Sequence, residues 1–98
     1  MYARLVRFSF GAGKRAAAQA IADDLAPLIA SQPGCGGVTV FGDDRDGEYG
    51  IFVLWDSEAN ADAAARLVRP KLEEHLAGHA QGPADARLFE VIPAQEGR

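Results

Sequence analysis

The chain has 98 residues, of which 48% are hydrophobic and 24% are charged, and its formal net charge is −4. This composition predicts one small folded domain spanning residues 1–98 and excludes a disordered chain. Because the basic residues are scattered along an acidic sequence, no nucleic-acid partner is expected. No apolar run approaches the ~20 residues of a membrane span and no leader precedes the first strand, so we expect a cytoplasmic protein without a membrane partner.

The first half of the chain predicts a strand, a helix and a second strand. Residues 2–10 alternate between apolar and polar side chains, as expected of a half-buried strand. Apolar residues recur at helical spacing over residues 14–31, and Pro27 should bend this helix or disorder its last turn. The glycine-rich turn that follows leads into a second strand at residues 38–42.

The second half predicts a hairpin, a divided helix and a last strand. The Asp46-Gly47 pair favours a type I′ turn into a third strand at residues 49–55. Asp56 or Ser57 can cap an alanine-rich helix, and Pro70 should make residues 70–77 a separate or kinked piece of it. The fourth strand is expected at residues 87–92, before a polar tail.

The predicted order, βαββαβ, is typical of a ferredoxin-like α+β fold with a four-stranded antiparallel sheet and two helices on one face. The third strand, however, is apolar on both faces, although a sheet covered on one side normally shows polar residues on the other. A second copy of the chain, packed sheet to sheet, is the expected cover, which predicts a homodimer.

The cysteine and histidine content gives no indication of a metal or cofactor. Cys35 is the single cysteine, so an internal disulfide is excluded and we interpret this side chain as a small hydrophobic residue. His75 and His79 have a spacing that suits two metal ligands on a helix, but Gly78 lies between them and no third ligand follows nearby. No metal site is expected.

Several short features, in this order along nearly the whole chain, resemble the antibiotic-biosynthesis-monooxygenase-like family. They are the VRF that ends the first strand, LAP in the first helix, PGC-x-G before the second strand, Trp55 at the end of the third, the following Ser57 with its alanines, and the final RLFEVI. The resemblance implies a dimeric α/β barrel with a pocket between the sheet and the helices of each protomer. It also implies a small ligand, since members oxidise polycyclic aromatics or quinols with O₂ and no cofactor, or degrade haem.

The sequence departs from the family pattern at positions that bear on activity. Many relatives have a histidine nine residues after the tryptophan, where this chain has Ala64. The haem-degrading members use an asparagine, a tryptophan and a histidine, and the matching positions here are Val6, Ala65 and His75. Only the histidine is retained, so haem degradation is not expected.

The resemblance and the residues together predict a binding site for a small apolar or aromatic molecule. Trp55 and Phe8 would form its walls, Arg4 or His75 its polar group, and Val6 and Ala64 further parts of its lining. As an enzyme the protein would be a cofactor-independent monooxygenase acting on an aromatic or quinol substrate. Two alternatives stay open: Trp55 could only close the core, and the protein could be a non-catalytic dimeric module for ligand binding or interaction.

Overall fold

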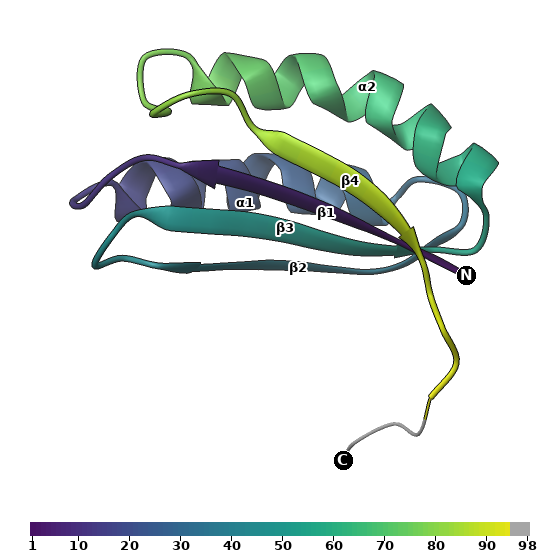
Figure 1. Ribbon diagram of the computed structural model, residues 1–98. Coiled ribbons are helices and arrows are strands. Elements are labelled where there is room, and N and C mark those ends of the chain that lie inside the picture. Colours follow the sequence, from purple (N-terminus) through teal and green to yellow (C-terminus); the bar gives the residue numbers. More distant parts are fainter. Residues whose placement is uncertain (95–98) are drawn as a thin grey trace.

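The computed structural model describes residues 1–94 and shows a four-stranded antiparallel sheet with both helices on one face (Figure 1). The elements are β1 (Tyr2–Ser9), α1 (Arg15–Ala30), β2 (Cys35–Asp43), β3 (Glu48–Trp55), α2 (Glu58–Leu76) and β4 (Asp85–Glu90). Their order and the strand order β2-β3-β1-β4 confirm the predicted ferredoxin-like fold. The last four residues of the predicted domain and polar tail lie outside the described residues.

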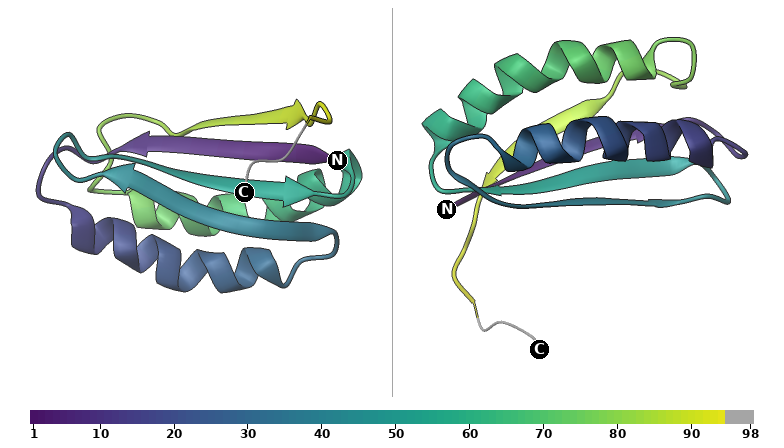
Figure 2. Two further views of the ribbon diagram at one scale, coloured as in Figure 1. Left: turned by 90° about the horizontal axis from the view of Figure 1, so that it is seen from below. Right: turned by 180° about the vertical axis from the view of Figure 1, so that it is seen from behind.

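The core lies between the helices and the face of the sheet that they cover (Figure 2). On β3 the alternating side chains of Tyr49, Ile51, Val53 and Trp55 are all buried, because successive side chains of a strand point to opposite faces of the sheet. Ile21 and Leu25 of α1 and Ile51 of β3 are the largest fully buried side chains. None of the helices within residues 1–94 is both long enough and apolar enough to cross a lipid bilayer.

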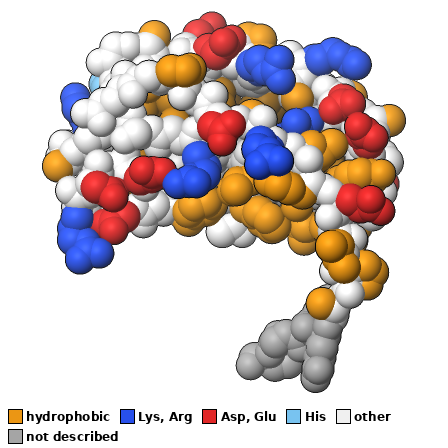
Figure 3. Space-filling model, in the orientation of Figure 1, with side chains coloured by type: hydrophobic (Ala, Val, Ile, Leu, Met, Phe, Trp, Pro, Cys, Tyr) orange, Lys and Arg blue, Asp and Glu red, His pale blue; other side chains and the backbone are white. Residues whose placement is uncertain are grey.

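The other face of the sheet carries no helix and exposes aromatic side chains. Phe52 on β3 is 37% exposed, Phe89 on β4 is 39% exposed and Phe41 on β2 is 43% exposed. Their positions opposite Leu5, Ala3 and Gly50 in the strand register place all three on this open face. Hydrophobic side chains gather along the lower side of the molecule in Figure 3, where the sheet faces away from the helices. The two-sided apolar character predicted for β3 is therefore present.

The two helical prolines do not interrupt their helices. α1 stays helical through Pro27 to Ala30, and α2 is one continuous helix across Pro70, so the predicted separate segment at residues 70–77 is wrong. Both prolines lie on exposed sides, where water can hydrate the carbonyl that loses its partner. Burial of the apolar stripes on the opposite sides outweighs the loss of one backbone hydrogen bond in each helix.

The turn between β2 and β3 also differs from the predicted type. A type I′ turn needs a positive φ at two successive residues, but here only Gly47 has one, at +76°. The Gly47 N–H donates to the carbonyl of Asp43 at 2.8 Å, closing a longer loop over residues 44–47. A Cβ at Gly47 would also lie 2.0 Å from the carbonyl oxygen of Gly11. This glycine is thus required both by the turn and by close backbone packing.

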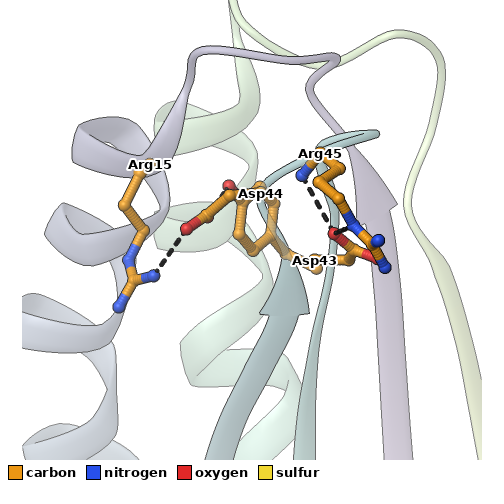
Figure 4. A network of polar contacts seen from close by, with 5 residues as sticks. Arg15, Asp43, Asp44 and Arg45 are labelled. Carbon is orange, nitrogen blue, oxygen red and sulfur yellow. Dashed lines mark hydrogen bonds and ion pairs between the residues drawn. The ribbon is translucent and has the colours of Figure 1, made fainter.

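A polar network joins the hairpin tip to the start of α1 (Figure 4). The Tyr49 hydroxyl donates to Asp44 Oδ1 at 2.6 Å, and Arg15 Nη1 donates to Asp44 Oδ2 at 2.9 Å. The Tyr49 hydrogen bond, with a smaller contribution from Arg15, lowers the pKa of the Asp44 carboxyl against the opposing effect of desolvation. The same hydrogen bond raises the pKa of Tyr49.

These pKa shifts predict that the network stabilises the fold most at neutral pH. Since the pKa of Asp44 is lower in the folded state, its contribution is present above the unfolded-state pKa, about 4, and is lost as the pH falls through the folded-state pKa. The contribution of Tyr49, whose pKa is raised, is lost as the pH rises through its folded-state value. In Tyr49→Phe, the free energy of unfolding should therefore fall less steeply than in wild type between about pH 5 and pH 3.

Urea unfolding at several pH values would measure this difference. Tyr2→Phe is the matched control, because it removes a tyrosine hydroxyl that has no hydrogen-bond partner recorded within residues 1–94. Identical pH slopes for wild type and Tyr49→Phe would contradict the assignment.

Candidate functional site

A cavity of about 410 Å³ lies between α2 and the sheet. This volume is within the range of small-molecule sites. Its lining is mainly apolar and comes from every layer of the fold: Arg4, Val6, Ile29, Ile51, Val53, Trp55, Ala61, Ala64, Ala65, Val68, Arg69, Leu72, Glu73, Leu76, Pro83, Ala84 and Ala86. The cavity therefore combines positions that are far apart in the sequence.

Small side chains on α2 create this space. The helix begins after Ser57, whose hydroxyl accepts the Asn60 N–H at 3.1 Å and so fixes where the first turn starts. The first turns then present Ala61, Ala64 and Ala65 to the sheet. A methyl group cannot span the distance that a leucine or histidine would fill, so the interior stays open beneath the N-terminal half of α2.

Trp55 forms one wall of the cavity and is also part of the core. Its side chain is 3% exposed and packs within the main hydrophobic cluster. Its indole Nε1 is buried and has no hydrogen-bond acceptor within residues 1–94. A buried N–H without a partner costs roughly 1–3 kcal/mol, which a ligand oxygen or a water molecule could recover. Both roles considered for Trp55 are thus compatible with its position.

Arg4 brings a permanent positive charge to the same wall. It lies on β1 opposite Val53, diagonal to Trp55, and its side chain is only 15% exposed. Arg4 Nη2 donates to Asp62 Oδ1 of α2 at 3.1 Å, whereas Arg4 Nε is buried without a partner among the described residues. The guanidinium group is positively charged and has five N–H donors, so the wall presents hydrogen-bond donors and positive charge to whatever occupies the cavity.

The structure brings four of the six predicted site residues together. Arg4, Val6, Trp55 and Ala64 line the cavity, but Phe8 and His75 do not. Phe8 lies on the helix-covered face of the sheet, at the end of β1 away from Trp55. Its ring packs there against the rings of Phe10 and Tyr49. His75 precedes Leu76 on α2 and points instead toward α1, with Nε2 2.8 Å from Asp24 Oδ2.

His79 is also separate from His75. Its ring lies 5.9 Å from the ring of Phe10, whereas His75 contacts Asp24. Within residues 1–94 no group of three histidine, cysteine, aspartate or glutamate side chains is placed to hold a metal ion.

Three charged residues at the cavity were missed from the sequence. Asp62, which holds Arg4, and the lining residues Arg69 and Glu73 share one edge of α2 at successive helical spacings. The sequence interpretation treated this alanine-rich segment only as a favourable helix. The spacing of these three charged residues indicates that they share one edge of the helix. That this edge lies at a cavity follows only once the buried stripe of α2 is known.

Fold and cavity together define a small ferredoxin-like α+β protein with an internal site for a small molecule. Residues 1–81 match the family model described as antibiotic biosynthesis monooxygenase. The chain therefore belongs to this family, which confirms the resemblance found in the sequence. Among curated proteins, none matches the chain.

Solved structures with low sequence identity share the fold over nearly the whole chain. A candidate antibiotic biosynthesis monooxygenase from Deinococcus radiodurans is 17% identical with a TM-score of 0.84, covering 100% of this chain and 99% of its own. The ActVA-Orf6 monooxygenase of Streptomyces coelicolor, solved with nanaomycin D, is 18% identical with a TM-score of 0.77, covering 99% and 92%. SnoaB of Streptomyces nogalater, a cofactor-independent oxygenase solved as the mutant N63A, is 22% identical with a TM-score of 0.72, covering 95% and 94%.

Proposed function

We propose that this protein is a cytoplasmic, homodimeric, cofactor-independent monooxygenase that oxidises a small planar phenol or quinol with O₂. The observation that supports this most is the apolar cavity whose wall contains the buried donors Arg4 Nε and Trp55 Nε1 without acceptors among the described residues. Family membership agrees with it, as do two structural neighbours, the cofactor-independent oxygenase SnoaB and the monooxygenase ActVA-Orf6.

In this reaction the substrate supplies all the electrons. The phenolic proton leaves to water at the cavity opening, and the positive charge of Arg4 stabilises the phenolate. A ring carbon of the phenolate bonds to O₂, and the resulting peroxide takes back one proton from water. The hydroperoxide then loses water together with the hydrogen of that ring carbon, which leaves a carbonyl. One oxygen atom of O₂ enters the product and the other leaves as water, so phenol plus O₂ gives quinone plus water.

The cavity suits this chemistry because it is both apolar and donor-rich. Stacking on Trp55 would orient a planar ring of the substrate. The indole N–H of Trp55 would bind the phenolate oxygen, which Arg4 also stabilises. The apolar lining excludes water, which strengthens the attraction between the guanidinium and the phenolate. Ala64 leaves room for the ring where many relatives are expected to have a histidine.

The homodimer is proposed from the open face of the sheet. Phe41, Phe52 and Phe89 expose aromatic surface there, on a face that no element of residues 1–94 covers. The equivalent face of a second copy has the same shape and composition, so two sheets packed about 10 Å apart would bury both sets of rings.

Oxygen uptake tests the proposal directly. The protein, incubated with a series of naphthols and naphthohydroquinones, should consume O₂ faster than the spontaneous reaction and release an equal amount of oxygenated product. This product is a naphthoquinone from a naphthol and a hydroxynaphthoquinone from a naphthohydroquinone. Binding of these compounds without turnover would indicate the non-catalytic ligand-binding alternative. Absence of both binding and turnover across the series would overturn the proposal.

Trp55→Phe should weaken phenol binding while largely preserving the fold. The substitution retains most of the apolar area but removes the indole N–H, so the affinity for a planar phenol should fall by about 1 kcal/mol, or roughly 5-fold. Titration of 1-naphthol against both variants would measure this. Naphthalene, which has no hydroxyl, is the matched ligand and should lose much less affinity. Equal affinity of both variants for 1-naphthol would limit Trp55 to a structural role.

A further inference from the structure

The charged residues around the cavity are unevenly distributed. The lining contains two arginines, Arg4 and Arg69, and one acidic residue, Glu73, although the whole chain has a formal net charge of −4. Asp62, just outside the lining, already pairs with Arg4, so Arg69 is the cationic side chain left for an anionic ligand at a cavity that is otherwise apolar.

Arg4, from β1, and Arg69, from α2, meet the cavity at different points along the length of α2. Arg4 is held at the N-terminal end of the helix by Asp62, and Arg69 follows Asp62 by seven residues, about 10 Å along the helix axis. Ala65, between them on the same edge, lines the cavity and leaves the space open. This axial rise between residues 62 and 69 is comparable to the length of a two-ring aromatic molecule.

Arg69, like the exposed Arg66 and Arg87, forms no ion pair within residues 1–94, and of these three it is the one that lines the cavity. Arg4, Arg7, Arg15 and Arg45 each pair with a carboxylate, whereas no ion pair involves Arg69 within residues 1–94. Glu73 lies one turn further along α2 without pairing with it, and an arginine followed by a glutamate four residues later is the weaker orientation for such a pair.

We infer that the substrate is a planar phenol with a carboxylate at the end away from its hydroxyl, and that Arg69 binds this carboxylate. The inference rests on the proposed function, since it takes the phenolic oxygen to lie at Arg4 and Trp55. The guanidinium of Arg69 can form two parallel hydrogen bonds to a carboxylate, which a neutral substituent cannot accept with equal strength.

A set of matched ligands and variants tests the inference. The ligands are 6-hydroxy-2-naphthoic acid, its primary amide and 2-naphthol, with dissociation constants measured by calorimetry at low and high salt. Wild type should bind the acid about 5- to 10-fold more tightly than the amide, and added salt should reduce this preference. Arg69→Gln should remove the preference without changing the affinity for the amide.

Two further variants serve as controls, one expected to have no effect and the other to increase the preference for the acid. Arg66→Gln removes an exposed arginine of the same helix that does not line the cavity, and it should behave as wild type. Glu73→Gln removes the nearby negative charge and should increase the preference for the acid, by about 2- to 3-fold.

The outcomes separate this inference from the proposed function. If 2-naphthol and the amide bind but the acid has no advantage, or if Arg69→Gln changes acid and amide alike, the inference is wrong and the proposed function stands. Tighter binding of an aminomethyl analogue than of the acid would also overturn it, since Glu73 would then be the recognition group. If none of the three ligands binds, the proposed function itself fails.

Discussion

Arg4→Gln is expected to lower kcat/KM for oxidation of a naphthol by roughly 100-fold, the usual effect of removing one donor that stabilises developing negative charge in an enclosed site. The reason is that the Arg4 side chain, only 15% exposed, lies in the cavity wall and is diagonal to Trp55 in the strand register. Stopped-flow measurement of quinone formation would determine the effect.

Two comparisons make this result interpretable. Arg4→Lys keeps the charge but loses the planar donor arrangement, so it should retain more activity than Arg4→Gln, with a loss of about 10-fold. Arg66→Gln removes an exposed arginine outside the cavity and should leave kcat/KM unchanged. A change of less than 3-fold in a folded Arg4→Gln protein would show that Arg4 does not stabilise the substrate anion.

Phe52→Glu is expected to dissociate the proposed dimer, raising its dissociation constant by about 100-fold or more. Phe52 lies on β3, an inner strand of the sheet, and 37% of its surface faces the uncovered side. In a sheet-to-sheet dimer a glutamate at this position would be buried without a partner in two symmetric copies. Sedimentation equilibrium over a range of protein concentrations would measure the change.

Leu67→Glu is the control for this experiment. Leu67 is 43% exposed, similar to Phe52, but it belongs to α2 on the other side of the molecule. The variant should remain dimeric. A wild-type mass of one chain at micromolar concentration, or an unchanged mass for Phe52→Glu, would contradict the proposed interface.

The departures from the sequence-based predictions have a common cause in tertiary packing. Proline propensity predicted a break at Pro70, yet burial of Leu72 and Leu76 beyond it holds α2 in one piece. The same packing rotates His75, one residue from Leu76, toward Asp24 and away from the cavity. Phe8, predicted as a cavity wall, lies on the covered face of the sheet, but there its ring packs against the rings of Phe10 and Tyr49.

The order of strands and helices and the buried face of β3 were determined by the sequence alone, because the 2-residue and 3.6-residue periods are local properties that need no knowledge of distant contacts. The family could also be identified from the sequence, because the short features that resemble it occur in order along the chain. The cavity was decided only by the tertiary structure. Its volume depends on how far α2 stands from the sheet, and the Arg4–Asp62 contact joins residues 58 positions apart, so neither follows from any local pattern.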